Sequence, residues 1–164
     1  MVVGYGPRIT WLDKEQHFHL YYPLRILNWV TTNNRSGTIM MTRRKILIVD
    51  DEYDITFVFK IILEESGFEA DIYNDPIVAL SMYKPCYYDL VMIDLKLPGM
   101  TGFELYNQIR TIDKKTKVCF LTSSEQFHQQ YRSNEFQDFD PILFIQKPVE
   151  NEVLINKINR IIEM

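Results

Sequence analysis

Cysteine and glycine are scarce in this chain of 164 residues, which contains two of the first and six of the second. The two cysteines, Cys86 and Cys119, are too few for a disulfide framework, so reduced thiols are expected. Cys119 lies in a predicted strand and is expected to be a buried core thiol. No phosphate-cradling glycine loop follows the first predicted strand, which argues against a flavin or dinucleotide site.

Long apolar runs are missing as well. No stretch approaches the roughly 18 uninterrupted apolar residues that a membrane-spanning helix needs, so no membrane insertion is expected. The first residues lack the basic start and apolar middle of a secretory signal, which predicts a cytoplasmic protein. The hydrophobic content of 46% and charged content of 24% are ordinary for a globular domain. This length allows one domain and a short extension.

The third missing feature is an excess of positive charge, since the net charge is −4. Residues 1–41 carry four basic and two acidic side chains, whereas the rest of the chain carries 14 basic and 20 acidic ones. The acidic part has no obvious basic face, so direct nucleic-acid binding is not expected. It suits a cation site better.

The clearest boundary lies near residue 41 and predicts an N-terminal extension (1–41) before a single domain (42–164). The extension shows no sustained periodicity, and its polar segment 31–38 has the composition of a loop or linker. It also contains both tryptophans of the chain, an aromatic content that is high for a disordered tail. One hypothesis is a true start at Met40 or Met41 and a mis-assigned extension. The alternative is a genuine arm that docks on the domain or on a partner.

From residue 43 onward, short apolar runs alternate with amphipathic segments. Runs of four or five apolar residues predict strands buried on both faces, and hence a parallel sheet covered by helices. Strands are predicted at 45–49, 68–73, 90–93, 117–121 and 142–145, and helices at 54–66, 75–83, 102–111, 124–136 and 150–162. Five such units with right-handed crossovers predict a doubly wound α/β fold with a five-stranded parallel sheet in the order 2-1-3-4-5.

Local signals support several of these boundaries. Asp75 before Pro76 is a typical helix start, and Gly67 is well placed to end the first helix. Two helices show apolar residues at helical spacing and are expected to bury them: Ile55, Val58, Phe59 and Ile62 in the first, and Val153, Leu154, Ile158, Ile161 and Ile162 in the last.

Carboxylates follow two of the predicted strands. Asp50 and Asp51 come directly after the first strand, and Asp94 follows the third. Because ligands bind outside the carboxyl ends of parallel strands, these three side chains are expected at one edge of the sheet. Three like charges in one place need a counter-charge, and Mg²⁺ favours one or two carboxylates, a carbonyl and waters. A single aspartate at a strand end would merely suggest a helix cap, but three together predict a magnesium site.

A hydroxyl and an amine are expected at the same edge. Thr122 lies at the end of the fourth strand with the small Ser123 beside it, and Lys147 follows the fifth strand. The next residue, Pro148, is commonly cis at such a turn, which would aim the lysine inward. Acids, metal, hydroxyl and amine together form a site that could bind a phosphoryl group on an aspartate.

The region from residue 43 to the end, about three quarters of the chain, resembles the receiver domain of response regulators in two-component signalling. A flavodoxin-like fold is implied by this resemblance. The matching motifs occur in the family's order and at similar spacing: Asp50-Asp51, Asp94 with Lys96-Leu-Pro-Gly, Thr122-Ser123 and Lys147-Pro148. The combination is highly specific, although no single motif would be.

The resemblance implies a role for each acid. Asp94 would be the phosphoryl acceptor, and Asp51 and Asp94 would ligate Mg²⁺ together with the backbone carbonyl of Lys96. Asp50 would act mainly through metal-bound water. The family takes its phosphoryl group from a histidine kinase, a histidine phosphotransfer protein or a small acyl phosphate. The receiver supplies only the metal and the electrostatics, so no further enzymatic activity is expected.

The switch residues implied by the resemblance are Thr122, Lys147 and Phe144. Thr122 would be the hydroxyl drawn toward the phosphoryl group, and Lys147 the amine that neutralises it. Phe144, three residues before the lysine, occupies the position of the aromatic switch residue, but it could equally be an ordinary packed strand residue. Switching would change the face formed by the fourth helix, fifth strand and fifth helix through a population shift.

The expected output is binding of a downstream protein partner or relay of the phosphoryl group. The sequence ends where the last receiver helix should end, which suggests a single-domain regulator, with a phosphorylation-dependent homodimer as an open question. Lys96 lies two residues after the acceptor, and Ser124 two after Thr122 lacks a carboxylate or amide that could position water. Slow self-dephosphorylation is therefore expected.

Two other classes of function compete with this interpretation. A metal-dependent phosphatase also places an aspartate after an apolar strand, but it usually carries a second carboxylate where this chain has Lys96. A receiver-fold interaction module that works without phosphorylation is the second alternative. The full set of acids, hydroxyl and lysine argues against it.

Overall fold

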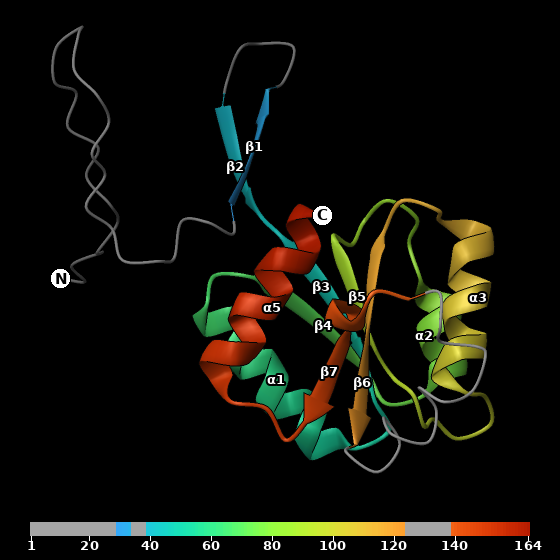
Figure 1. Cartoon of the computed structure of the whole chain (residues 1–164). Coiled ribbons are helices and arrows are strands. Elements are labelled where there is room, and N and C mark those ends of the chain that lie inside the picture. Colours follow the sequence, from blue (N-terminus) through green and yellow to red (C-terminus); the bar gives the residue numbers. More distant parts are fainter. Residues whose placement is uncertain (1–28, 34–38, 124–138) are drawn as a thin grey trace, which may run out of the picture.

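The computed structural model describes residues 29–33, 39–123 and 139–164, and its central element is a parallel sheet (Figure 1). The sheet has the order β4-β3-β5-β6-β7, which is 2-1-3-4-5 when its five strands are numbered along the chain. The predicted doubly wound, flavodoxin-like α/β fold is thus confirmed. The strands are β3 (Lys45–Val49), β4 (Glu69–Tyr73), β5 (Leu90–Asp94), β6 (Lys117–Ser123) and β7 (Phe144–Lys147).

Helices cover both faces of the sheet. Figure 1 shows α1 and α5 on one face and α2 and α3 on the other. Side chains of β3 alternate between the two cores: Ile48 packs with the α1 and α5 residues, and Val49 with the α2 and α3 residues. The described α-helices are α1 (Tyr53–Glu65), α2 (Pro76–Met82), α3 (Gly102–Ile112) and α5 (Asn151–Glu163).

The predicted helix boundary signals are confirmed. The side chain of Asp75 accepts hydrogen bonds from the backbone N–H groups of Ile77 and Val78, at 2.8 and 3.1 Å, and so caps α2. Gly67 follows the end of α1 with a φ of +92°, a conformation that favours glycine. These caps fix where each helix begins or ends relative to the strand beside it.

Two predicted core residues are on the surface instead. Val58 in α1 is 51% exposed and Val153 in α5 is 50% exposed. Each stands next to a buried residue, and neighbouring residues on a helix point about 100° apart. The buried stripes follow a spacing of three and four residues: Thr56, Phe59 and Leu63 in α1, and Leu154, Ile158 and Ile161 in α5.

The last strand begins later than predicted. Residues Pro141–Leu143 form a short 3₁₀ helix, η2, because the Asp140 side chain accepts a hydrogen bond from the Ile142 N–H at 2.9 Å. β7 therefore starts at Phe144, and Lys147 is its last residue rather than part of the following loop. The peptide bond between Lys147 and Pro148 is cis, as predicted.

A hairpin precedes the parallel sheet. Strands β1 (Trp29–Asn33) and β2 (Ile39–Arg43) pair antiparallel in a separate two-stranded sheet, which extends away from the domain in Figure 1. Residues 31–33 are thus in a strand, although their polar composition predicted a loop. The domain boundary at residue 41 and the origin of the extension stay predictions, and the predicted helix at 124–136 lies outside the described residues. Within the described ranges, no helix is long and apolar enough to cross a membrane.

Candidate functional site

The carboxyl ends of β3, β5 and β7 bring two acids and a lysine into direct contact. Lys147 Nζ lies 2.8 Å from Asp50 Oδ2 and 2.7 Å from Asp94 Oδ1. The two aspartates are buried, with exposures of 0% and 4%. A buried carboxylate needs a charged or hydrogen-bonding partner, and here one ammonium serves two of them. The predicted convergence of Asp50, Asp94 and Lys147 is therefore present.

The position of Asp94 is fixed by the turn that leads from β5 into α3. Its Oδ2 accepts a hydrogen bond from the backbone N–H of Lys96 at 2.6 Å. Gly102, the first residue of α3, packs directly against the Asp94 carbonyl, where any Cβ would collide with the backbone. Only glycine lets the helix start this close to the strand end.

The other acid, Asp50, is held mainly by its neighbours in the chain and by Lys147. Its Oδ1 accepts a hydrogen bond from the Glu52 N–H at 3.0 Å. Glu52 also lies 3.7 Å from Lys147 Nζ, a contact that the sequence reasoning missed. The run Asp50-Asp-Glu52 contained a signal for it, since a third acid follows directly on the pair.

Burial and charge shift the titration of the contacting pair. Burial raises the pKa of the Asp94 carboxyl, and repulsion from Asp50 adds to this, whereas Lys147 and the Lys96 N–H oppose it. Burial also opposes the positive charge of Lys147, but hydrogen bonds and attraction from Asp50 and Asp94 outweigh it and raise the pKa of its ammonium. The lysine therefore stays charged, and burial disfavours the ionised form of Asp94.

A cavity of about 510 Å³ opens next to this cluster. Asp51 is exposed at its wall, in keeping with a side chain that could reach a ligand there. The lining residues are Asp51, Glu52, Asp94, Lys96, Leu97, Pro98, Ser123 and Lys147. The cavity thus combines two carboxylates predicted as metal ligands with the predicted lysine and the residue whose carbonyl was expected to join them.

The donor set fits Mg²⁺, although it is not a ready-made cage. Among residues 29–33, 39–123 and 139–164, no group of three His, Cys, Asp or Glu side chains is arranged to hold a metal. Mg²⁺ keeps several waters and is commonly bound through only one or two carboxylates. Asp51 and Asp94 border the same cavity and meet that need, whereas Asp50 is fully buried and does not line it.

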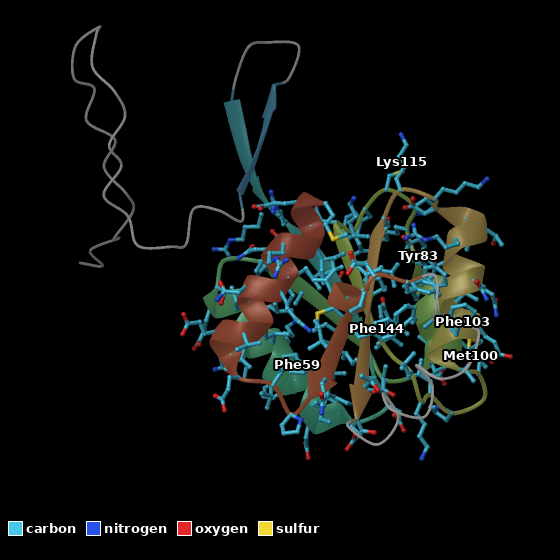
Figure 2. All side chains as sticks on the ribbon, viewed as in Figure 1. Phe59, Tyr83, Met100, Phe103, Lys115 and Phe144 are labelled. Carbon is cyan, nitrogen blue, oxygen red and sulfur yellow. The ribbon has the colours of Figure 1, made fainter. Side chains whose placement is uncertain are left out.

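Thr122 and Phe144 are both packed away from the cavity. Thr122 is fully buried, and its hydroxyl donates to the Ser123 carbonyl at 3.1 Å, so it is Ser123 that lines the cavity. Phe144 is 4% exposed and stacks on Phe120 with ring centroids 5.4 Å apart. Figure 2 labels it near the middle of the sheet, and it belongs to the core against which Phe103 packs. The switch roles of both residues stay predictions.

Comparison with known proteins identifies the class to which this fold and site belong. The response regulator receiver domain model matches residues 46–159, and the chain belongs to that family. Receiver domains accept a phosphoryl group on an aspartate within two-component phosphorelays, and they interact with histidine kinases and downstream partners. The recognition made from the sequence motifs is therefore confirmed.

Particular relatives come from several organisms. The chain is 32% identical over 83 residues to sporulation initiation phosphotransferase F of Bacillus subtilis, covering 51% of this chain and 67% of that protein. It is 30% identical over 118 residues to the uncharacterized transcriptional regulatory protein YkoG of B. subtilis, covering 72% of this chain but 50% of that protein. It thus spans about half of YkoG.

Solved structures show the same fold. The non-phosphorylated HemR receiver domain of Leptospira biflexa superposes with a TM-score of 0.63 at 27% identity, over 74% of this chain and 96% of the other. A CheY-like receiver domain protein of Methanospirillum hungatei gives 0.59 at 28% identity, over 74% and 95%. Both cover nearly the whole of the solved chain.

Proposed function

We propose that this protein is a cytoplasmic, stand-alone response regulator that accepts a phosphoryl group on Asp94 from a histidine kinase or a histidine phosphotransfer protein, with Mg²⁺. The observation that carries the proposal is the environment of Asp94. It is a buried carboxylate, paired at 2.7 Å with Lys147, at the wall of a cavity that it shares with Asp51. The alternative, an interaction module without phosphorylation, has no need for that arrangement.

The transfer exchanges one bond for another at phosphorus. An Asp94 oxygen attacks, the phosphorus–nitrogen bond of phosphohistidine breaks, and the imidazole leaves. Asp51, Asp94 and the Lys96 carbonyl would hold Mg²⁺, which supplies positive charge to the phosphoryl oxygens when bound. Lys147 already lies between Asp50 and Asp94 and can pair with a phosphoryl oxygen. The Lys96 N–H orients the acceptor carboxylate through its bond to Oδ2.

The output would begin at Thr122 and Phe144. To bond a phosphoryl oxygen, the Thr122 hydroxyl must give up the Ser123 carbonyl, and that motion loosens the packing beside β7. The Phe144 carbonyl accepts a hydrogen bond from Lys157 Nζ at 2.6 Å, so a change in β7 is transmitted to α5. The responsive face would comprise β7, α5 and the predicted helix at 124–136, and it would bind a downstream protein, relay the phosphoryl group or form a homodimer.

The lifetime of the phosphorylated state would depend on Lys96. Its side chain is exposed at the cavity wall, two residues after the acceptor, where hydrolytic water must approach. A long amine at this position obstructs that approach, so slow self-dephosphorylation and no turnover of free substrates are proposed. A Lys96→Asn variant should lose its phosphoryl group faster.

Intact mass spectrometry tests the proposal directly. Incubation with Mg²⁺ and acetyl phosphate or phosphoramidate should add one phosphoryl group, about 80 Da, and the gain should vanish with EDTA. The Asp94→Asn variant, which keeps the size of the side chain, should gain nothing. An equal gain in that variant would place the acceptor elsewhere. No gain from either small donor or from a histidine kinase would favour the phosphorylation-independent module.

A further inference from the structure

Asn74 lies directly after β4 and contacts the acidic end of β3 from the neighbouring strand. Its Nδ2 donates to the Asp50 carbonyl at 2.7 Å and to Thr56 Oγ1 at 3.0 Å. The side-chain amide has two hydrogens, and both are used. No sequence signal singled out this residue, because an asparagine after a strand ordinarily suggests a turn.

These contacts hold the peptide unit that leads into Asp51. The Asp50 N–H donates to the Tyr73 carbonyl at 3.3 Å, and the Asp50 carbonyl is bound by Asn74, so the backbone of Asp50 is tied to β4 on both sides. The peptide bond is planar, and a fixed carbonyl therefore fixes the N–H of Asp51 and the direction in which its Cα leaves.

The second contact extends this link to the helix. Thr56 is fully buried in α1, and its hydroxyl accepts from Asn74 and donates to the Tyr53 carbonyl at 2.9 Å. Both hydrogens of the Asn74 amide and the Thr56 hydroxyl are used in this chain of hydrogen bonds. Asn74 thus joins the end of β4, the end of β3 and the first turns of α1 at one point.

The orientation of Asp51 depends on that backbone. Within the described part of the chain, its carboxylate takes part in no hydrogen bond or ion pair, and it stands exposed at the cavity wall. A metal ligand without side-chain support can be placed only by its main chain. We infer that Asn74 is a positioning residue that holds Asp51 in the geometry needed to bind Mg²⁺. This inference rests on the proposed function.

Lys60 offers a matched control. It lies in α1, and its Nζ donates to the Ala70 carbonyl of β4 at 2.9 Å. It therefore ties the same helix to the same strand by a side-chain-to-carbonyl hydrogen bond, but at the opposite end of the strand from the cavity. Loss of this tie removes a comparable structural link without touching Asp50 or Asp51.

The experiment compares Mg²⁺ binding by the full chain and by three variants, using calorimetry, with thermal unfolding in EDTA alongside. Asn74→Ala should weaken Mg²⁺ binding by about tenfold or more, as loss of outer-shell support does in other metal sites. Lys60→Met should leave the affinity unchanged while lowering the unfolding temperature in EDTA. Thr56→Val, which removes one of the two Asn74 partners, should weaken binding by about threefold.

Two results would overturn the inference. One is an affinity of Asn74→Ala within twofold of the unchanged chain, and the other is an equal loss of affinity in Lys60→Met, which would show a general effect of stability. If Asn74→Ala does not fold, Thr56→Val decides, and an unchanged affinity counts against the inference. Absence of Mg²⁺ binding by the unchanged chain would instead remove the metal from the proposed function itself.

Discussion

Each end of the parallel sheet has a buried aspartate, and the hydrogen-bond donors around the two carboxylates differ. Asp94 lies at the carboxyl end of β5, and Asp113 lies before the start of β6, at the other end. Each is 4% exposed. Figure 2 shows Tyr83 and Lys115 at the Asp113 end, away from the arrowheads of β6 and β7. Burial alone therefore does not distinguish the two carboxylates.

Hydrogen-bond donors distinguish them. Asp113 accepts from the Thr116 hydroxyl at 2.6 Å, the Tyr83 hydroxyl at 3.2 Å, and the backbone N–H groups of Cys86, Lys115 and Thr116. Asp94 accepts from one backbone N–H and shares Lys147 with Asp50. The first carboxylate is saturated, whereas the second retains acceptor capacity toward a cavity.

The pKa values reflect this contrast. Burial alone would raise the pKa of Asp113, but its hydrogen bonds outweigh burial and hold the pKa well below the usual range. At Asp94 burial prevails and the pKa is raised. A saturated buried carboxylate stabilises the fold, and an unsaturated one beside a cavity is available for chemistry. The comparison thus distinguishes a carboxylate that stabilises the fold, Asp113, from one that is available for chemistry, Asp94.

Removal of the saturated carboxylate should have the largest effect on stability. Asp113→Ala leaves three backbone N–H groups without their acceptor and removes the nearest acceptor of the Thr116 hydroxyl, and we expect a loss of about 3 kcal/mol in the free energy of unfolding. Urea denaturation measures this loss. Asp94→Ala, the matched variant at the other end, should lose less than about 1 kcal/mol, because Lys147 keeps Asp50 as its partner and burial disfavours ionised Asp94.

The effects of the same two substitutions on phosphoryl incorporation should rank in the reverse order. Folded Asp113→Ala should be phosphorylated as fully as the unchanged chain, and Asp94→Ala should not be phosphorylated at all. A clear drop in incorporation by Asp113→Ala under conditions where it is folded would mean that the two ends are coupled and that the comparison fails.

The sequence predicted the fold well because the strands of a buried parallel sheet are short apolar runs. The run at 90–93 was assigned correctly because all residues of β5 are buried. Val58 and Val153 were misplaced because hydropathy marks an apolar residue without fixing the rotation of its helix. The start of β7 was missed because Asp140 caps a 3₁₀ turn within an apolar run.

For the site, the sequence predicted the residues but not their contacts. Asp50, Asp94 and Lys147 were brought together correctly because parallel strands end at a common edge. The Thr122 hydroxyl points to the Ser123 carbonyl, and a strand pattern cannot show the rotamer that decides this. Asn74 was missed because its hydrogen bond to Asp50 joins residues 24 apart. Asp113 was not considered, since some of its donors come from the distant segment 83–86.

Two buried threonines at opposite ends of β6 sharpen the comparison. Thr116 Oγ1 lies 2.6 Å from Asp113 Oδ2 and 3.1 Å from the Tyr83 hydroxyl, whereas among the described residues the Thr122 hydroxyl bonds the next carbonyl alone. Thr116→Val should cost about 2 kcal/mol of unfolding free energy, and Thr122→Val less than about 1 kcal/mol. Valine keeps the shape of threonine in both cases, so urea denaturation reports the hydroxyl alone.

Phosphorylation should reveal what Thr122 does. In the unchanged chain, addition of the phosphoryl group should alter amide hydrogen exchange in β7 and α5, and in Thr122→Val that response should be lost while incorporation persists. An unaltered response in Thr122→Val would assign the switch to another group, of which Ser123 at the cavity wall is the nearest candidate.

The pH dependence of stability is the most diagnostic effect because its sign differs between the two ends. The pKa of Asp113 is lower in the folded state, so its contribution to stability is present above the unfolded-state pKa of about 4 and is lost as the pH falls. The pKa of Asp94 is higher in the folded state. Folding therefore favours its neutral form, and ionised Asp94 costs stability at neutral pH.

Asparagine variants make this difference measurable as two curves of relative unfolding free energy against pH, with opposite slopes. Relative to the unchanged chain, Asp113→Asn should be least stable at neutral pH and begin to recover only below about pH 4, whereas Asp94→Asn should be more stable at neutral pH and lose that advantage before the pH has fallen to about 4. Urea denaturation from about pH 3 to 7 without Mg²⁺ measures both curves. Slopes of the same sign would mean that Lys147 satisfies Asp94 as completely as five donors satisfy Asp113. The distinction between an unsaturated and a saturated carboxylate would then be lost. Electrostatics would no longer give a reason to assign the chemistry to the carboxyl end of the sheet.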